Sequence, residues 1–306
     1  MTRLFTLFLT FSLAVFGVFS GANAALVEPL NGQDQSFFWK IEKEGVGPSY
    51  LLGSMHTGYK DSELPLEYVA HLEKSDRLVL EISPEDEDLM PLVFTMYNLE
   101  GTTRKTLGET RYQALFKKWG EIGLEPQLIE SLNLWAIMML FEMALPEPLS
   151  ADFGVDFLLT EKARELNKAM HPLEDVSVSI EKFSSIPTDR LLEAIDIRIE
   201  HFDAMQAQIS ELARRYYEGD TASVLAYANE DQLSDFYSEE AKAYWDDWFV
   251  RQILTERNHL WMPELLPLLE AGNSFIAVGA LHLFGEEGLL NLLEKEGYEL
   301  TPIILK

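Results

Sequence analysis

Apolar runs typical of β-strands lie near both ends of this 306-residue chain, and the region between them has the spacing of helices. Residues 37–42 alternate apolar and polar side chains, and residues 50–54 follow after a turn, which predicts a β-hairpin. The runs at 77–82 and 274–279 are typical of strands buried on both faces, and 298–305 predicts a closing strand. A sheet that takes strands from both ends of the chain predicts a single α/β unit.

The middle of the chain, about residues 85–270, is mostly helical in pattern. Apolar residues spaced by threes and fours predict one long amphipathic helix from near Pro187 to Tyr216. A short strand is expected at 169–173, and Pro263 is expected to kink or restart a later helix. The predicted fold class is therefore α/β, with a central mixed β-sheet built from N- and C-terminal strands and a large, mostly helical middle segment acting as a cap.

The first 24 residues differ in composition from the rest. Arg3 is their only charge, an apolar run follows, and Ala22-Asn23-Ala24 resembles a cleavage site, as in a secretory signal peptide. The alternative is a retained membrane anchor, but the run is shorter than the about 20 residues that a span needs. The expected division is a signal peptide at 1–24 and one domain at 25–306, exported to the periplasm or secreted.

No later segment predicts a membrane span. The best candidate, Leu132 to Leu145, is too short and contains Glu142, so a buried helix is expected there. The chain carries 24 Lys and Arg against 51 Asp and Glu, a net charge of −27, which argues against nucleic acid as a partner. Because the chain has no cysteine, disulfides, thiol catalysis and cysteine-ligated zinc are excluded. The acidic run at 85–88 predicts a solvated helix start.

Two histidines occur in matching surroundings. His56 ends the run Gly53-Ser54-Met55-His56 and His282 ends Gly279-Ala280-Leu281-His282, and each G-x-x-H unit directly follows an apolar strand. Ligands and catalytic groups of open α/β sheets cluster at the carboxyl ends of strands. Gly285, just after His282, is expected to open a helix whose free N–H groups could hold an anionic group.

Glu81 is the third candidate, at the end of a buried strand where an ionised carboxylate needs a partner. Two imidazoles and one carboxylate form a known ligand set for a catalytic divalent cation, which lowers the pKa of a bound water. The alternative is structural: His56 and His282 cap their strands, and Glu81 makes a salt bridge.

Other candidates carry weaker signals. Arg257 could stabilise a developing oxyanion or fix Glu81. Its neighbours Glu256 and His259 share a helix face and could be a surface patch or part of the site. Ser54 lacks the G-x-S-x-G surroundings of a nucleophile.

Taken in order, the motifs resemble those of the TraB/PrgY/GumN family, which includes the Tiki-type metalloproteases. The resemblance spans about residues 36–303 and rests on short motifs at 52–56, 80–81, 154–158, 173–174, 217–220, 256–258, 278–283 and 285–298. It implies an α/β fold related to the erythromycin-esterase and ChaN-like group.

The resemblance also implies an activity, that of a metal-dependent hydrolase acting on a peptide or protein. Carried over by motif, His56 and His282 would ligate a divalent cation such as Mn²⁺, Co²⁺ or Zn²⁺. Glu81 would be a third ligand or the general base, and Arg257 would stabilise charge on the tetrahedral intermediate. Two alternatives stay open: a protein of the pheromone-shutdown type that binds peptide without cleaving it, and a metal-dependent esterase. The sequence does not give the oligomeric state.

Overall fold

The computed structural model describes residues 27–30, 32–82, 84, 93–229 and 234–305. The predicted signal peptide at 1–24 and the acidic run at 85–88 lie outside these residues. Along the described chain no helix is long and apolar enough to cross a membrane. The division into a signal peptide and one capped domain stays a prediction.

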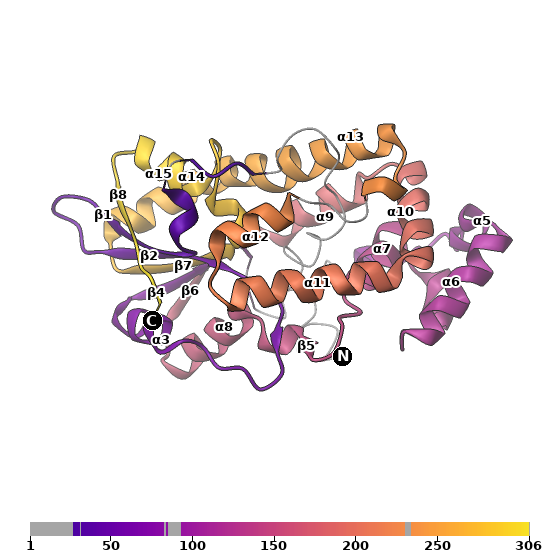
Figure 1. The fold of residues 1–306 in the computed structure, drawn as a ribbon, viewed down its shortest axis with the longest axis horizontal. Helices are drawn as coiled ribbons and strands as arrows, with labels where there is room; N and C mark the ends of the chain where they lie inside the picture. Colours follow the sequence, from indigo (N-terminus) through magenta and orange to yellow (C-terminus); the bar gives the residue numbers. More distant parts are fainter. Residues whose placement is uncertain (1–26, 31, 83, 85–92, 230–233, 306) are drawn as a thin grey trace.

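A six-stranded mixed sheet forms the centre of the fold (Figure 1). Its strand order is β6-β4-β7-β2-β1-β8, in which the first four strands are parallel and β1 is antiparallel to both of its neighbours. The strands are β1 (Phe38–Glu42), β2 (Ser49–Ser54), β4 (Arg77–Leu80), β6 (Ala169–Pro172), β7 (Ser274–Gly279) and β8 (Glu299–Pro302). A separate antiparallel pair joins β3 (Gly58–Tyr59) to β5 (Leu149–Ser150). The predicted α/β class and the mixed sheet built from both ends of the chain are confirmed.

The central strands are as buried as their apolar runs predict. Every residue of β2 and β7 is buried, and the two strands run in parallel with Ser54 opposite Gly279. On the other side of β7, Leu80 of β4 pairs with Ala277. The carboxyl ends of β2, β7 and β4 therefore lie side by side at one edge of the sheet.

Helices make up most of the middle segment. Figure 1 shows α14 and α15 on one side of the sheet, α3 and α8 on the other, and α5, α6 and α10 away from it. The helices are α3 (Leu66–Lys74), α5 (Thr103–Leu107), α6 (Glu109–Glu121), α7 (Leu134–Glu142), α8 (Val155–Glu165), α9 (Val176–Ser184), α10 (Thr188–Glu200), α11 (Phe202–Tyr217), α12 (Thr221–Ala228), α13 (Glu239–Asp247), α14 (Glu256–Ala271) and α15 (Leu289–Lys295). The buried helix expected within 132–145 is confirmed as α7, of which eight of the nine residues are buried.

Two helix predictions were wrong in detail. The long helix from Pro187 is two helices, α10 and α11, because the backbone breaks at His201, whose ring stacks on Phe236 at 3.5 Å. The expected restart at Pro263 does not occur, since α14 continues through it and Pro267. The expected kink at Pro263 stays a prediction. Both prolines are exposed, so the carbonyls left without an N–H partner can be hydrated. A π-helix, Trp248–Thr255, joins α13 to α14.

Candidate functional site

Three of the predicted site residues meet at one edge of the sheet. His56 lies two residues after β2, Glu81 directly after β4, and His282 in the 3₁₀ helix Ala280–Leu283 that follows β7. All three are buried, with exposed fractions of 2%, 6% and 1%. Since β4, β7 and β2 are adjacent parallel strands, the fold brings together residues that lie far apart in the chain.

Gly279 marks the point where these side chains converge. Its N–H donates to Glu81 Oε1 at 2.6 Å. A Cβ placed on Gly279 would lie 3.2 Å from that oxygen. The same Cβ would lie 3.5 Å from His282 Cδ2 and 3.8 Å from His56 Nε2. The glycine of the second G-x-x-H motif therefore keeps open the space that the three side chains share. In the first motif, a Cβ on Gly53 would come within 2.9 Å of the Ala280 backbone, so that glycine allows the two motifs to pack together.

Arg257, from the first turn of α14, connects the cluster. Its Nη2 donates to Glu81 Oε2 at 2.6 Å and lies 2.9 Å from Glu174 Oε1, while its Nη1 lies 3.3 Å from His282 Nε2. Its guanidinium also lies over the Trp261 ring, 4.6 Å from the centroid. Glu174 accepts a further hydrogen bond from Trp261 Nε1 at 2.8 Å. These contacts fix the guanidinium between two buried carboxylates and an imidazole.

His56 is oriented by a carboxylate. Its Nδ1 hydrogen-bonds to Asp156 Oδ2, from the first turn of α8, and Asp156 Oδ1 accepts from Ser54 Oγ. A Cβ on Gly154 would lie 2.2 Å from the His56 carbonyl oxygen, so this glycine lets the start of α8 approach the histidine. His56 Nε2 is buried and has no hydrogen-bond partner among the described residues. The ring thus directs one unused nitrogen toward Gly279.

His282 is held by an amide instead. Asn258 donates hydrogen bonds from Nδ2 to the carbonyls of His282 and Glu287. Its Oδ1, 2.7 Å from His282 Nδ1, therefore accepts a hydrogen bond from the Nδ1–H of the imidazole. The opposite nitrogen, Nε2, is then an acceptor facing Arg257. Burial and the charge of Arg257 lower the pKa of His282 to about 3, against the opposing charge of Glu81. This imidazole is therefore neutral at physiological pH.

The pKa values of Glu81 and His56 are also shifted from their ordinary values. Burial opposes ionisation of Glu81, but the charge of Arg257, the two histidines and the Gly279 N–H together hold the pKa of Glu81 well below its ordinary value. Burial also opposes protonation of His56, but the charge and hydrogen bond of Asp156 raise the pKa of His56 overall. Even with His56 protonated, the three carboxylates Glu81, Glu174 and Asp156 outnumber the cations His56 and Arg257, so the buried cluster carries excess negative charge.

The family model described as TraB/PrgY/gumN family matches residues 37–302. The chain belongs to this family. The uncharacterized protein YbaP of Shigella flexneri is 25% identical, over 83% of this chain and 90% of its own length. The Metalloprotease TIKI homolog of Amphimedon queenslandica is 22% identical, over 89% of this chain and 62% of that protein. Metalloprotease TIKI2 of Danio rerio is 24% identical, over 90% of this chain and 63% of that protein.

Donor types at this TraB/PrgY/gumN-family site fit a divalent cation. His56 Nε2 is an unpartnered buried nitrogen whose ring is oriented by a carboxylate, an arrangement typical of metal-ligating histidines. The excess negative charge favours a cation as well. In the described part of the chain, however, no group of three or more His, Asp or Glu is arranged to hold a metal ion. Arg257 contacts Glu81 Oε2 and His282 Nε2, so a cation would have to compete with its guanidinium for both side chains.

Sequence reasoning missed Asp156 and Glu174 as members of the site. Both lie in motifs quoted for the family resemblance, at 154–158 and 173–174, so the motifs were the available signal. A carboxylate in the first turn of a helix, such as Asp156, is also what the helix dipole alone favours. Only the fold shows that each contacts a site residue, Asp156 through His56 and Glu174 through Arg257.

Several other candidates do not join the cluster. Glu256 pairs with Lys182 and Arg251, and the exposed His259 pairs with Glu287, so the patch beside Arg257 is separate from it. The helix expected at Gly285 was wrong: α15 begins at Leu289, and the Gly285 N–H donates to Gln33 Oε1 at 3.0 Å. Gly285 has a φ of 88°, outside the helical range, so the helix N-terminus predicted there as an anion site is not formed. The Ser54 hydroxyl is tied to Asp156 and to the Val278 carbonyl oxygen.

Proposed function

We propose that this protein is an exported, metal-dependent hydrolase that acts on peptides or proteins. The observation that carries the proposal is the convergence of His56, His282 and Glu81 on the space at Gly279, with His56 Nε2 buried and unpartnered. Two relatives that are named as metalloproteases support the reaction class. The signal-like first 24 residues support export.

His56 and His282 would hold the cation through their Nε2 atoms, with Glu81 as third ligand or general base. A divalent cation such as Mn²⁺, Co²⁺ or Zn²⁺ would lower the pKa of water so that hydroxide is available near neutral pH. Glu81, kept ionised by Arg257, can accept a proton from water. Arg257 supplies a fixed positive charge beside the same space, which favours an oxyanion as the substrate carbonyl is attacked. Asp156 fixes the orientation of the His56 ring.

A second candidate is a protein of this family that binds peptide without cleaving it. The observation that favours it is Arg257, which contacts both Glu81 and His282 Nε2 and would compete with a metal for them. A metal-dependent esterase would use the same residues, so ester and peptide substrates have to be compared directly.

The test combines metal analysis with hydrolysis of a peptide library and of ester substrates. We expect the purified protein to retain Mn²⁺, Co²⁺ or Zn²⁺ and to cleave peptides, and chelation to abolish cleavage until one of these ions is restored. His56→Ala and His282→Ala should lose both metal and activity, whereas His259→Ala, which removes an exposed histidine on α14, should lose neither. A wild-type protein with no metal and no turnover would contradict the hydrolase proposal, and retained peptide binding would then favour the second candidate.

A further inference from the structure

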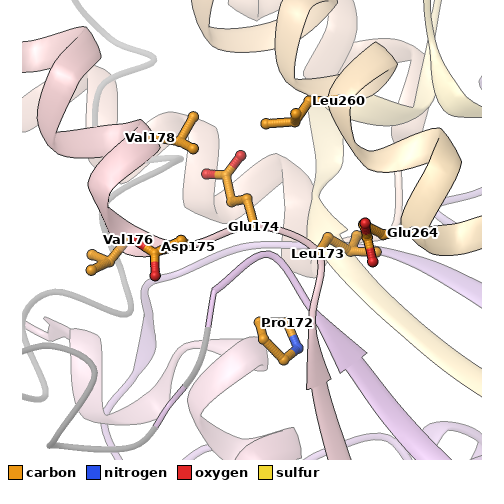
Figure 2. A pocket seen from close by; sticks show the side chains of 8 residues that line it. All are labelled: Pro172, Leu173, Glu174, Asp175, Val176, Val178, Leu260 and Glu264. Carbon is orange, nitrogen blue, oxygen red and sulfur yellow. The ribbon is translucent and has the colours of Figure 1, made fainter.

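A hollow of about 410 Å³ lies at the carboxyl end of β6, next to the buried cluster. Figure 2 shows Val178 of α9 and Leu260 of α14 on either side of it, with the Glu174 carboxylate between them. Val176 adds to the apolar wall, and two more carboxylates, those of Asp175 and Glu264, also line the hollow. Its volume lies within the range of small-molecule and side-chain binding pockets.

This hollow is next to the proposed reaction centre. Glu174, which lines it, lies 2.9 Å from Arg257 Nη2, and the same nitrogen donates to Glu81 at 2.6 Å. One nitrogen atom therefore bridges Glu174, whose side chain is fully buried in the wall of the hollow, and the proposed catalytic carboxylate. A peptide whose scissile bond lay at Glu81 would place a neighbouring side chain within reach of the hollow.

We propose that this hollow is a substrate subsite that binds an apolar side chain of a peptide next to a basic residue. The inference rests on the proposed function, because it assumes that peptides approach Glu81. We call the hollow, lined by Glu174, Asp175, Val176, Val178, Leu260 and Glu264, the β6 pocket.

The walls explain the apolar preference. Val178 is only partly buried, and Leu260 is 46% exposed, so both present apolar surface to an incoming side chain. Covering that surface with an apolar group is favourable in proportion to the area removed from water. Glu174 does not add an unsatisfied charge to the pocket, because Arg257, Trp261 and Ser179 all donate to it.

The two remaining carboxylates explain the basic preference. The Asp175 side chain accepts from the Ser177 N–H at 2.8 Å, and hydrogen bonds from Ser177 lower the pKa of Asp175, so it is ionised at neutral pH. Glu264 is exposed, one helical turn after Leu260 on α14. The net charge of the chain, −27, also favours the approach of basic peptides.

The experiment measures binding rather than turnover. Three fluorescein-labelled octapeptides of Gly and Ser would carry a central Phe-Lys, Ser-Lys or Phe-Glu pair, and their anisotropy would be followed with wild-type and His56→Ala protein. We expect Phe-Lys to bind about 10-fold or more tighter than Ser-Lys, as for burial of one large apolar side chain. It should bind about 2- to 5-fold tighter than Phe-Glu, as for exposed charges.

Matched variants localise the effect to the β6 pocket. Leu260→Trp fills it and should remove most of the preference for Phe, whereas Leu128→Trp, at a leucine of similar exposure outside it, should not. Glu264→Lys should reverse the preference for Lys over Glu, whereas Glu270→Lys, an equal charge change on α14, should not.

Three results would each overturn the subsite, whatever the hydrolysis assays show. They are equal binding of all three peptides, no binding of any peptide, and equal effects from a variant and its control. A clear preference without metal or turnover would overturn the hydrolase proposal and leave the pocket as a peptide-binding site.

Discussion

Two buried arginines have different surroundings in this protein. Arg198, in α10, pairs with Glu142 of α7, and also donates to the Tyr237 hydroxyl at 3.2 Å. Arg257 instead lies between Glu81 and Glu174, with His282 on its third side. The first arginine joins two helices through one pair of opposite charges, whereas the second belongs to a cluster with more carboxylates than cations.

The pKa shifts of the two paired carboxylates, Glu142 and Glu81, reflect this difference. Burial raises the pKa of Glu142, and the single charge of Arg198 only partly opposes it. For Glu81 the opposing effects of Arg257, the histidines and the Gly279 N–H exceed the effect of burial, so the pKa is lowered. In the helical region, Arg198 thus offsets part of the cost of burying Glu142. At the sheet edge, the surroundings keep Glu81 charged, as a metal ligand or a general base must be.

The largest expected effect on stability comes from breaking the balanced pair. Arg198→Met should lower the free energy of unfolding by about 3–5 kcal/mol, because Glu142 would be left buried without its cation. Urea unfolding followed by circular dichroism measures the change. The double variant Arg198→Met with Glu142→Leu should recover most of the loss, since it removes both charges. A single variant as stable as wild type would show that the pair contributes little to the fold.

The second prediction concerns the unbalanced cluster, where we expect loss of activity with less loss of stability. Glu81→Gln should lower kcat about 10²- to 10⁴-fold, the usual contribution of a general base. Arg257 keeps Glu174 as a charged partner, so the free energy of unfolding should fall much less than in Arg198→Met. Glu256→Gln, whose carboxylate lies outside the cluster, is the control and should retain activity. If Glu81→Gln instead unfolded the protein with no separate effect on kcat, Glu81 would be structural like Glu142.

The sequence predicts the strands and the two site histidines, but not the partners of the two buried arginines. Apolar runs identified β2, β4 and β7, and the G-x-x-H motifs identified His56 and His282, because strand burial and glycine leave local signals. The break at His201 was not visible, since apolar spacing is the same on both sides of it. The partners of Arg198 and Arg257 were not visible either, because Glu142 and Glu174 are distant in the chain and such contacts depend on how the helices pack.

The smallest expected effect is a difference in pH dependence. Because the pKa of Glu142 is raised on folding, its contribution to stability is fully present below its ordinary pKa of 4.5 and is lost as the pH rises through the folded value. The stability of wild type relative to Glu142→Gln should therefore fall as the pH is raised from 4 toward 7. Arg198 is the charge that faces Glu142, and it stays protonated throughout this range.

A partly exposed carboxylate gives the control of opposite sign. Arg214 and Arg215 lower the pKa of Glu211 to about 2, so its contribution is present above its ordinary pKa of 4.5 and is lost as the pH falls. Relative to Glu211→Gln, wild type should therefore gain stability as the pH is raised, by a small amount because solvent screens these ion pairs at the surface. Unfolding midpoints in urea at each pH would measure both differences. If both differences changed in the same direction, Glu142 would not be held with a raised pKa, and the contrast with the sheet edge would have to rest on the geometry of its hydrogen bonds alone.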